Sequence, residues 1–159
     1  MVNTLFDDLG GRDCLERVHK IFYDKLLVHP WLKGFFENND QWHLEVQQTE
    51  FMMRLFGGPV IYRGRMPKYA HIHMFIPEDV FMERHQILND SLIEARVAPD
   101  LIERWLAYDL GLKLALVKKS VSQCSRRYVS EPITIVKKPG CPFQYAPEIL
   151  QESPSAPRD

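Results

Sequence analysis

The sequence contains few cysteines, and their spacing suits neither a local metal site nor a disulfide framework. Cys14, Cys124 and Cys141 lie far apart, and no two of them form a C-x-x-C pair. Zinc fingers and small disulfide-rich domains both need closely spaced cysteines. An apolar core must therefore stabilise the fold.

The sequence also has no excess of charge of either sign and no long hydrophobic run. Its 20 Lys and Arg residues face 21 Asp and Glu residues, so the attraction behind sequence-independent nucleic-acid binding is absent. The apolar stretch 110–117 contains Lys113 and is too short to cross a bilayer. We expect neither a nucleic-acid nor a membrane partner. Residues 1–8 lack the basic and apolar regions of an export signal, which predicts a cytoplasmic protein.

Helical periodicity is the clearest pattern that is present. The chain has 159 residues, 45% of them hydrophobic, which is typical of one globular domain. Apolar residues recur every three or four positions and predict helices over residues 12–28, 41–56, 77–96 and 99–120. Pro67 predicts one short helical turn over residues 67–73. No alternation typical of strands occurs before residue 120, so the predicted fold class is all-α.

The composition changes after Ser120. Six of the 11 prolines follow this residue, and residues 148–159 have the polar character of a disordered end. Residues 128–136 contain β-branched side chains in partial alternation. They predict an extended, strand-like segment that packs on the helical body.

The most distinctive motif follows the helix predicted over residues 41–56. The paired glycines Gly57 and Gly58 end a helix, Pro59 prevents it from resuming, and His71 follows seven residues after Gly64. This order resembles the truncated (2/2) haemoglobins, most of all their first, cyanoglobin-like group. The same order continues at Leu9-Gly10-Gly11, Phe22-Tyr23, Phe35-Phe36, Gln48, Ile76 and Phe81. The resemblance implies a 2-on-2 helical sandwich over residues 1–119, followed by a proline-rich extension over residues 120–159.

The resemblance also implies a haem cofactor whose iron is bound by His71. The chain has no C-x-x-C-H motif, so the cofactor would be haem b, held by coordination and packing. His73 is the rival ligand. Two residues along a helix rotate a side chain by about 200°, so the two imidazoles cannot face the same iron, and the family's spacing to Ile76 favours His71.

On the opposite face of the haem, the resemblance implies Tyr23, Leu44, Gln47 and Gln48. The Tyr23 phenol and the Gln48 amide would stabilise a bound gas by hydrogen bonds. Some family members have a histidine or lysine that binds the iron at the position of Gln47. We therefore expect five-coordinate ferrous iron, with His43 nearby and Tyr23 in the ferric state as alternatives.

Aromatic residues would form the rest of the pocket. Phe36 would stack on the porphyrin, and Phe51 and Phe81 would supply apolar wall. Tyr62 and Lys68 lie on the stretch that would reach the haem propionates.

The function implied by the resemblance is reversible binding of dioxygen, nitric oxide and carbon monoxide. NO dioxygenase activity is a further implied reaction, and it would need a separate electron donor because the chain has no Gly-rich dinucleotide motif. One alternative is a gas-responsive regulator that signals through the extension. Another is a helical binding module without haem.

Overall fold

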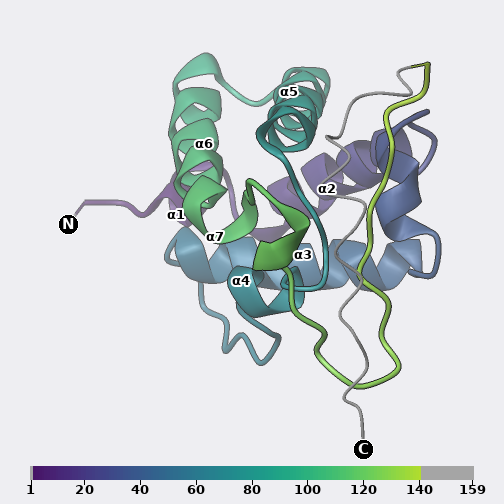
Figure 1. Cartoon of the computed structure of the whole chain (residues 1–159). Coiled ribbons are helices and arrows are strands. Elements are labelled where there is room, and N and C mark those ends of the chain that lie inside the picture. The colour runs from purple at the N-terminus through teal and green to yellow at the C-terminus, as the bar shows by residue number, and fades with distance from the viewer. Residues whose placement is uncertain (1, 141–159) are drawn as a thin grey trace, which may run out of the picture.

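The computed structural model describes residues 2–140, and the regular structure there is helical (Figure 1). The helices are α1 (Leu5–Asp8), α2 (Arg12–Leu26), α3 (Gln41–Leu55), α4 (Pro67–Ala70), α5 (Glu78–Glu94), α6 (Pro99–Gly111) and α7 (Lys113–Leu116), with the 3₁₀ turns η1 (Leu32–Phe36) and η2 (Val121–Gln123). Within residues 2–140 no strand forms, and one isolated parallel bridge pairs Met74 with Thr134. The all-α prediction is confirmed.

Four long helices form the body of the molecule. Helix α2 packs against both α3 and α5, and α5 packs against α6. The apolar stripe of α2 explains this central place, because Leu15, Val18, Phe22 and Leu26 are almost completely buried. Two helix pairs, α2 with α3 and α5 with α6, thus share one core (Figure 1). No helix within residues 2–140 has the length and apolar character to cross a membrane.

The ends of α3 follow from its sequence. Asp40 caps the start, because its carboxylate accepts a hydrogen bond from the His43 amide at 3.0 Å. Gly57 lies just beyond the end with a φ of 85°, a conformation that side chains disfavour. A Cβ on Gly57 would also lie 2.8 Å from Cγ2 of Thr4. The chain therefore leaves α3 at the predicted glycines.

The predicted helices end one or two residues earlier in the structure, except for two that end three or more residues earlier. The segment 99–120 is divided after Gly111 into α6 and α7. It leaves the helix at Val117, because the Lys118 amide donates to the Ile76 carbonyl at 2.9 Å and not to a helical partner. The turn begun by Pro67 ends at Ala70, which places His71 at the helix end and not within the helix.

Beyond α7 the chain returns across the segment between α4 and α5. The predicted strand-like segment 128–136 packs on the body, but Thr134 alone forms a bridge pair. Close to the end of this segment, Val136 lies against Gly34 of η1. The predicted disordered end, residues 148–159, lies outside the described residues.

Candidate functional site

His71 follows α4 and has the geometry of a neutral imidazole ready to bind a metal. Its Nδ1 lies 2.8 Å from the Pro67 carbonyl oxygen. A carbonyl can only accept, so Nδ1 carries the proton and Nε2 keeps its lone pair. Burial lowers the pKa of His71 to about 4, although the bond to Pro67 acts to raise it. The imidazole is therefore uncharged at neutral pH.

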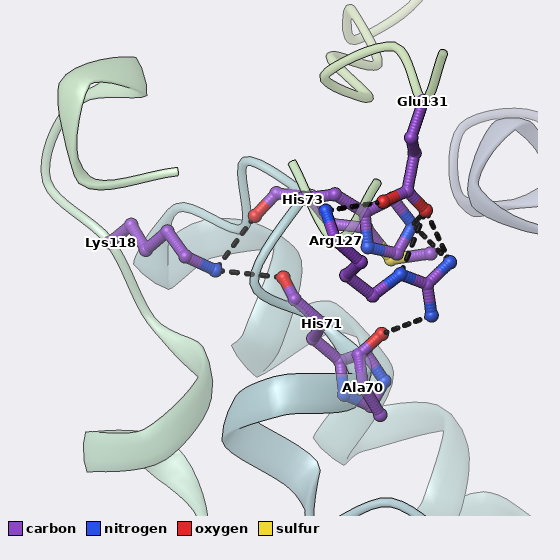
Figure 2. A network of polar contacts seen from close by, with 7 residues as sticks. Ala70, His71, His73, Lys118, Arg127 and Glu131 are labelled. Atoms are coloured by element: carbon purple, nitrogen blue, oxygen red, sulfur yellow. Dashed lines mark hydrogen bonds and ion pairs between the residues drawn. The ribbon is translucent and has the colours of Figure 1, made fainter. Parts of the chain in front are cut away.

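His73 lies in different surroundings. Its Nε2 is 3.5 Å from both a Glu131 carboxylate oxygen and the Arg127 guanidinium (Figure 2). Its Nδ1 is buried and has no hydrogen-bond partner among residues 2–140. Burial is the main cause that lowers the pKa of His73. The imidazole thus faces the residues after α7.

Tyr23 is a buried phenol on α2. Its ring contacts Phe22 and Phe36 edge-on, with centroids 5.3 and 6.1 Å away. Burial raises the pKa of Tyr23 to about 12, so the hydroxyl keeps its proton. This hydroxyl forms no hydrogen bond with another residue of the described part of the chain. A donor of this kind is available to a guest molecule.

The predicted residues on α3 separate into two sides. Phe51 is buried and its ring centroid lies 5.4 Å from that of Tyr62. Leu44 and Gln48 are half-buried on the inner side, whereas Gln47 is exposed. Of the two glutamines, Gln48 is therefore the one that lies toward the core.

The residues predicted to reach the haem edge lie in the loop before α4 and within α4 itself. The Tyr62 hydroxyl donates to the Arg65 carbonyl at 2.9 Å, and Lys68 is exposed. Neither of these side chains lines the nearby basic hollow of about 300 Å³. That hollow is lined by Arg65, Tyr69, Ile72, Arg126 and Arg127. Arg126 and Arg127, which lie after α7, were not predicted as site residues.

A partly buried cation, Arg84, was not predicted from the sequence. Its guanidinium lies 5.4 Å from the Phe22 ring centroid and 5.9 Å from that of Phe81, and Nη1 is 2.7 Å from Oδ1 of Asp109. The charge of Arg84 lowers the pKa values of both Tyr23 and His71, secondary to burial. The residue is therefore within electrostatic reach of both faces of the site.

Arg84 is not alone in this buried network. His85 Nδ1 lies 2.7 Å from the second oxygen of Asp109. Burial acts to raise the pKa of Asp109, but Arg84 and His85 hold it below its ordinary value. The sequence held a signal for the position of Arg84. Phe81, Arg84 and Leu88 are spaced as i, i+3 and i+7, so they share one face of a helix.

The donor set fits a haem. One neutral imidazole presents Nε2, as an axial ligand must, and its other nitrogen is oriented by a backbone carbonyl. Six of the apolar side chains that pack on the core while remaining partly accessible come from η1, α3, the loop before α4 and the segment after His71. Such side chains suit a cofactor pocket. These are Phe36, Leu44, Leu55, Val60, Tyr62 and Met74.

Comparisons with known proteins agree with this arrangement. Residues 4–118 match the family model described as "Bacterial-like globin". A group 1 truncated hemoglobin of Tetrahymena thermophila is 31% identical over 99 residues, covering 62% of this chain and 82% of that protein. The homologue from Tetrahymena pyriformis is 38% identical over 68 residues, which span 43% of this chain and 56% of that protein's length.

Solved structures give the same result for the fold. The ferric truncated hemoglobin of Tetrahymena pyriformis has a TM-score of 0.65 at 28% identity and covers 74% of this chain and 100% of its own. The 2/2 hemoglobin of Synechococcus, in a cyanomet state with covalently attached heme, has a TM-score of 0.62 at 26% identity and covers 67% of this chain and 90% of its own. The predicted truncated-globin sandwich is confirmed. The chain belongs to the bacterial-like globin family, among the group 1 truncated hemoglobins.

Proposed function

We propose that this protein is a haem b protein that reversibly binds dioxygen, nitric oxide and carbon monoxide. Membership of the family implies haem-based gas binding. The observation that carries the proposal is the His71 imidazole, whose Nδ1–H donates to Pro67 and whose pKa is lowered to about 4. Such a side chain is fixed in tautomer and orientation before it meets a metal.

The distal residues act on the guest molecule. The Tyr23 phenol keeps its proton and has no hydrogen-bond partner among residues 2–140. Gln48, half-buried on α3, supplies an amide. Both groups donate to a polar diatomic ligand and slow its departure.

The apolar residues exclude water and hold the ring. Phe36, Leu44, Phe51 and Phe81 supply hydrophobic surface from η1, α3 and α5. Tyr62 and Lys68 remain the predicted contacts at the haem edge, and Arg65 adds a basic side chain next to them.

NO dioxygenase activity is the reaction that this site supports. When bound, the haem supplies reversible gas binding. With dioxygen and nitric oxide together, it supplies oxidation of nitric oxide to nitrate, which costs the haem one electron. A separate donor must return that electron to the haem. The residues of this chain orient the reactants: Tyr23 and Gln48 hold the dioxygen by hydrogen bonds. The electron donor is a required partner.

Absorption spectra of the full chain test the proposal. After haem addition we expect a Soret band, a five-coordinate ferrous spectrum and a shift on adding carbon monoxide. Mixing the dioxygen form with nitric oxide should give one nitrate per haem. A chain that acquires no Soret band is a helical module without haem, and the proposal is then wrong.

A gas-responsive regulator is the second candidate. One observation favours it: residues 118–134 form hydrogen bonds with the segment that carries His71. Hydrogen exchange of residues 118–140 decides between the two. A regulator requires exchange that changes when carbon monoxide binds, whereas a carrier or dioxygenase leaves it unchanged.

A further inference from the structure

The segment that carries His71 is too short to hold its own shape. Helix α4 has four residues and ends directly before His71. One turn of helix is unfavourable to form, because it fixes several backbone angles for few hydrogen bonds. The position of the imidazole must therefore depend on contacts from elsewhere in the chain.

Those contacts come from the residues after α7. Six carbonyl oxygens in the segment from Ala70 to Ile76 accept a hydrogen bond from residues 118–134. The bonds are Arg127 Nη1 to Ala70 at 3.4 Å, Lys118 Nζ to His71 at 3.0 Å and to Met74 at 2.8 Å, and the amides of Ser125 to Ile72 at 2.8 Å, Thr134 to His73 at 2.8 Å and Lys118 to Ile76 at 2.9 Å.

Lys118 bonds to both ends of the backbone turn that begins at His71. Its ammonium group donates to the carbonyls of His71 and Met74, which lie three residues apart (Figure 2). Its own amide donates to Ile76. A single partly buried side chain thus fixes the backbone of the predicted iron ligand itself.

Arg127 and Glu131 hold the same segment from its other side. Glu131 is only 3% exposed, and it accepts hydrogen bonds from the Arg127 amide at 2.8 Å and from Nε at 2.7 Å. The guanidinium, held in this way, reaches the Ala70 carbonyl, and Glu131 lies beside His73 (Figure 2). Two guanidinium donors, Nε and Nη2, converge on Oε1 of Glu131 while the Arg127 amide donates to Oε2, and together these bonds fix the direction of the Arg127 side chain.

An apolar anchor keeps these residues in place. Phe75 and Val121 are buried together, and Cys124, Ile133 and Ile135 pack against them. Further along, Val136 lies against Gly34. The residues that supply the six hydrogen bonds begin at Lys118, where the family match over residues 4–118 ends.

We propose that residues 118–136 form a strap that positions His71, and that Lys118 and Arg127 are its positioning residues. The proposal rests on the proposed function, since it assigns the strap a role toward the iron ligand. By fixing the backbone on both sides of His71, the strap restricts rotation of the imidazole. It thereby sets the strength of the bond that this ring forms to the haem iron.

Resonance Raman spectroscopy of the ferrous full-length protein tests the strap through the iron–histidine stretching band. Lys118→Met removes two hydrogen bonds and keeps an apolar stem of similar length. We expect the band to move to lower frequency and to broaden, and Lys118→Arg to restore it. Arg127→Met, which leaves Lys118 in place, should shift the same band.

Lys119→Met is the matched control, because this neighbouring lysine is exposed and its side chain forms no hydrogen bond within residues 2–140. It should leave the band unchanged. If Lys118→Met does not fold, Arg127→Met decides in the same way. An unchanged band in the folded variants overturns the strap. A full-length protein without any iron–histidine band overturns instead the proposed function.

Discussion

At the scale of single residues, burial and hydrogen bonding give each group of the site one protonation state. His71 is a neutral ligand because burial lowers its pKa to about 4. Tyr23 is a neutral donor because burial raises its pKa to about 12. Arg84 is a permanent charge that acts on both groups, and it is held by Asp109. The proposed site therefore combines a neutral imidazole, a neutral phenol and a cation.

Replacing Tyr23 with phenylalanine should speed dioxygen dissociation. The change removes the hydroxyl and keeps the ring that contacts Phe22 and Phe36. Loss of one hydrogen bond to a polar ligand costs about 1 kcal/mol or more, so the rate should rise roughly fivefold or more. Stopped-flow measurement of dioxygen release checks this. Carbon monoxide, a weaker acceptor, serves as the control ligand, and an unchanged dioxygen rate would remove Tyr23 from the distal site.

Replacing Arg84 should weaken anionic ligands selectively. A buried unit charge at an effective dielectric of about 20 contributes on the order of 1 kcal/mol, so the Kd of azide on the ferric protein should rise roughly fivefold. Arg84→Met combined with Asp109→Asn avoids an unpaired carboxylate and retains an acceptor for His85. Spectroscopic titration with azide, compared with neutral imidazole, checks the prediction. Equal changes for both ligands would mean that the charge is not the cause.

At the scale of the helices, polar side chains within the core set how the elements meet. His19 on α2 is 1% exposed, and its Nδ1 lies 2.7 Å from the Thr49 hydroxyl on α3. The ring also meets Trp105 of α6 edge-on, at 5.7 Å. One histidine thus contacts both sides of the sandwich.

Thr49→Val should destabilise the protein by about 1–3 kcal/mol, because it leaves a buried imidazole nitrogen without its partner. Denaturant unfolding measures the change. Thr49→Ser keeps the hydroxyl and should cost less. A valine variant as stable as the original would show that the hydrogen bond contributes nothing between α2 and α3.

Most of the helices could be predicted from the sequence, because helix formation depends on local patterns of residues. Apolar spacing predicted the four long helices, and Gly57 predicted the end of α3. The end of the helical segment at Val117 could not be predicted, since it depends on Lys118 meeting Ile76, which lies 42 residues away. Arg84, His19 and the strap were not predicted for the same reason, since each has a partner that is distant in sequence. The partners are Asp109 for Arg84, Thr49 for His19 and the segment 70–76 for the strap.

At the scale of the whole molecule, the site lies where the two helix pairs and the returning chain meet. Helix α2 supplies Tyr23, α3 supplies Gln48, α5 supplies Phe81, and α4 leads into His71. The family match ends at residue 118, so the segment that follows could not be interpreted from the resemblance. The cytoplasmic location stays a prediction of the sequence.

Stability of the haem-free protein should fall as the pH falls from 6.5 to about 5. The pKa values of His19 and His71 are lowered from 6.5 to about 3 and about 4 by burial. The unfolded chain then binds more protons than the folded one over this range, so acid favours unfolding. Each histidine contributes up to about 1.4 kcal/mol per pH unit. Urea unfolding measures this, and His19→Gln should reduce the slope; stability that is constant or rises toward pH 5 contradicts the burial of both rings.

The account depends most directly on coordination by His71, and His71→Gly tests it. We predict that the full-length variant loses its five-coordinate ferrous spectrum and its uptake of carbon monoxide, and that free imidazole restores both, while His73→Gly leaves them unchanged. Normal pigment and carbon monoxide binding in the His71→Gly variant without imidazole would contradict the account.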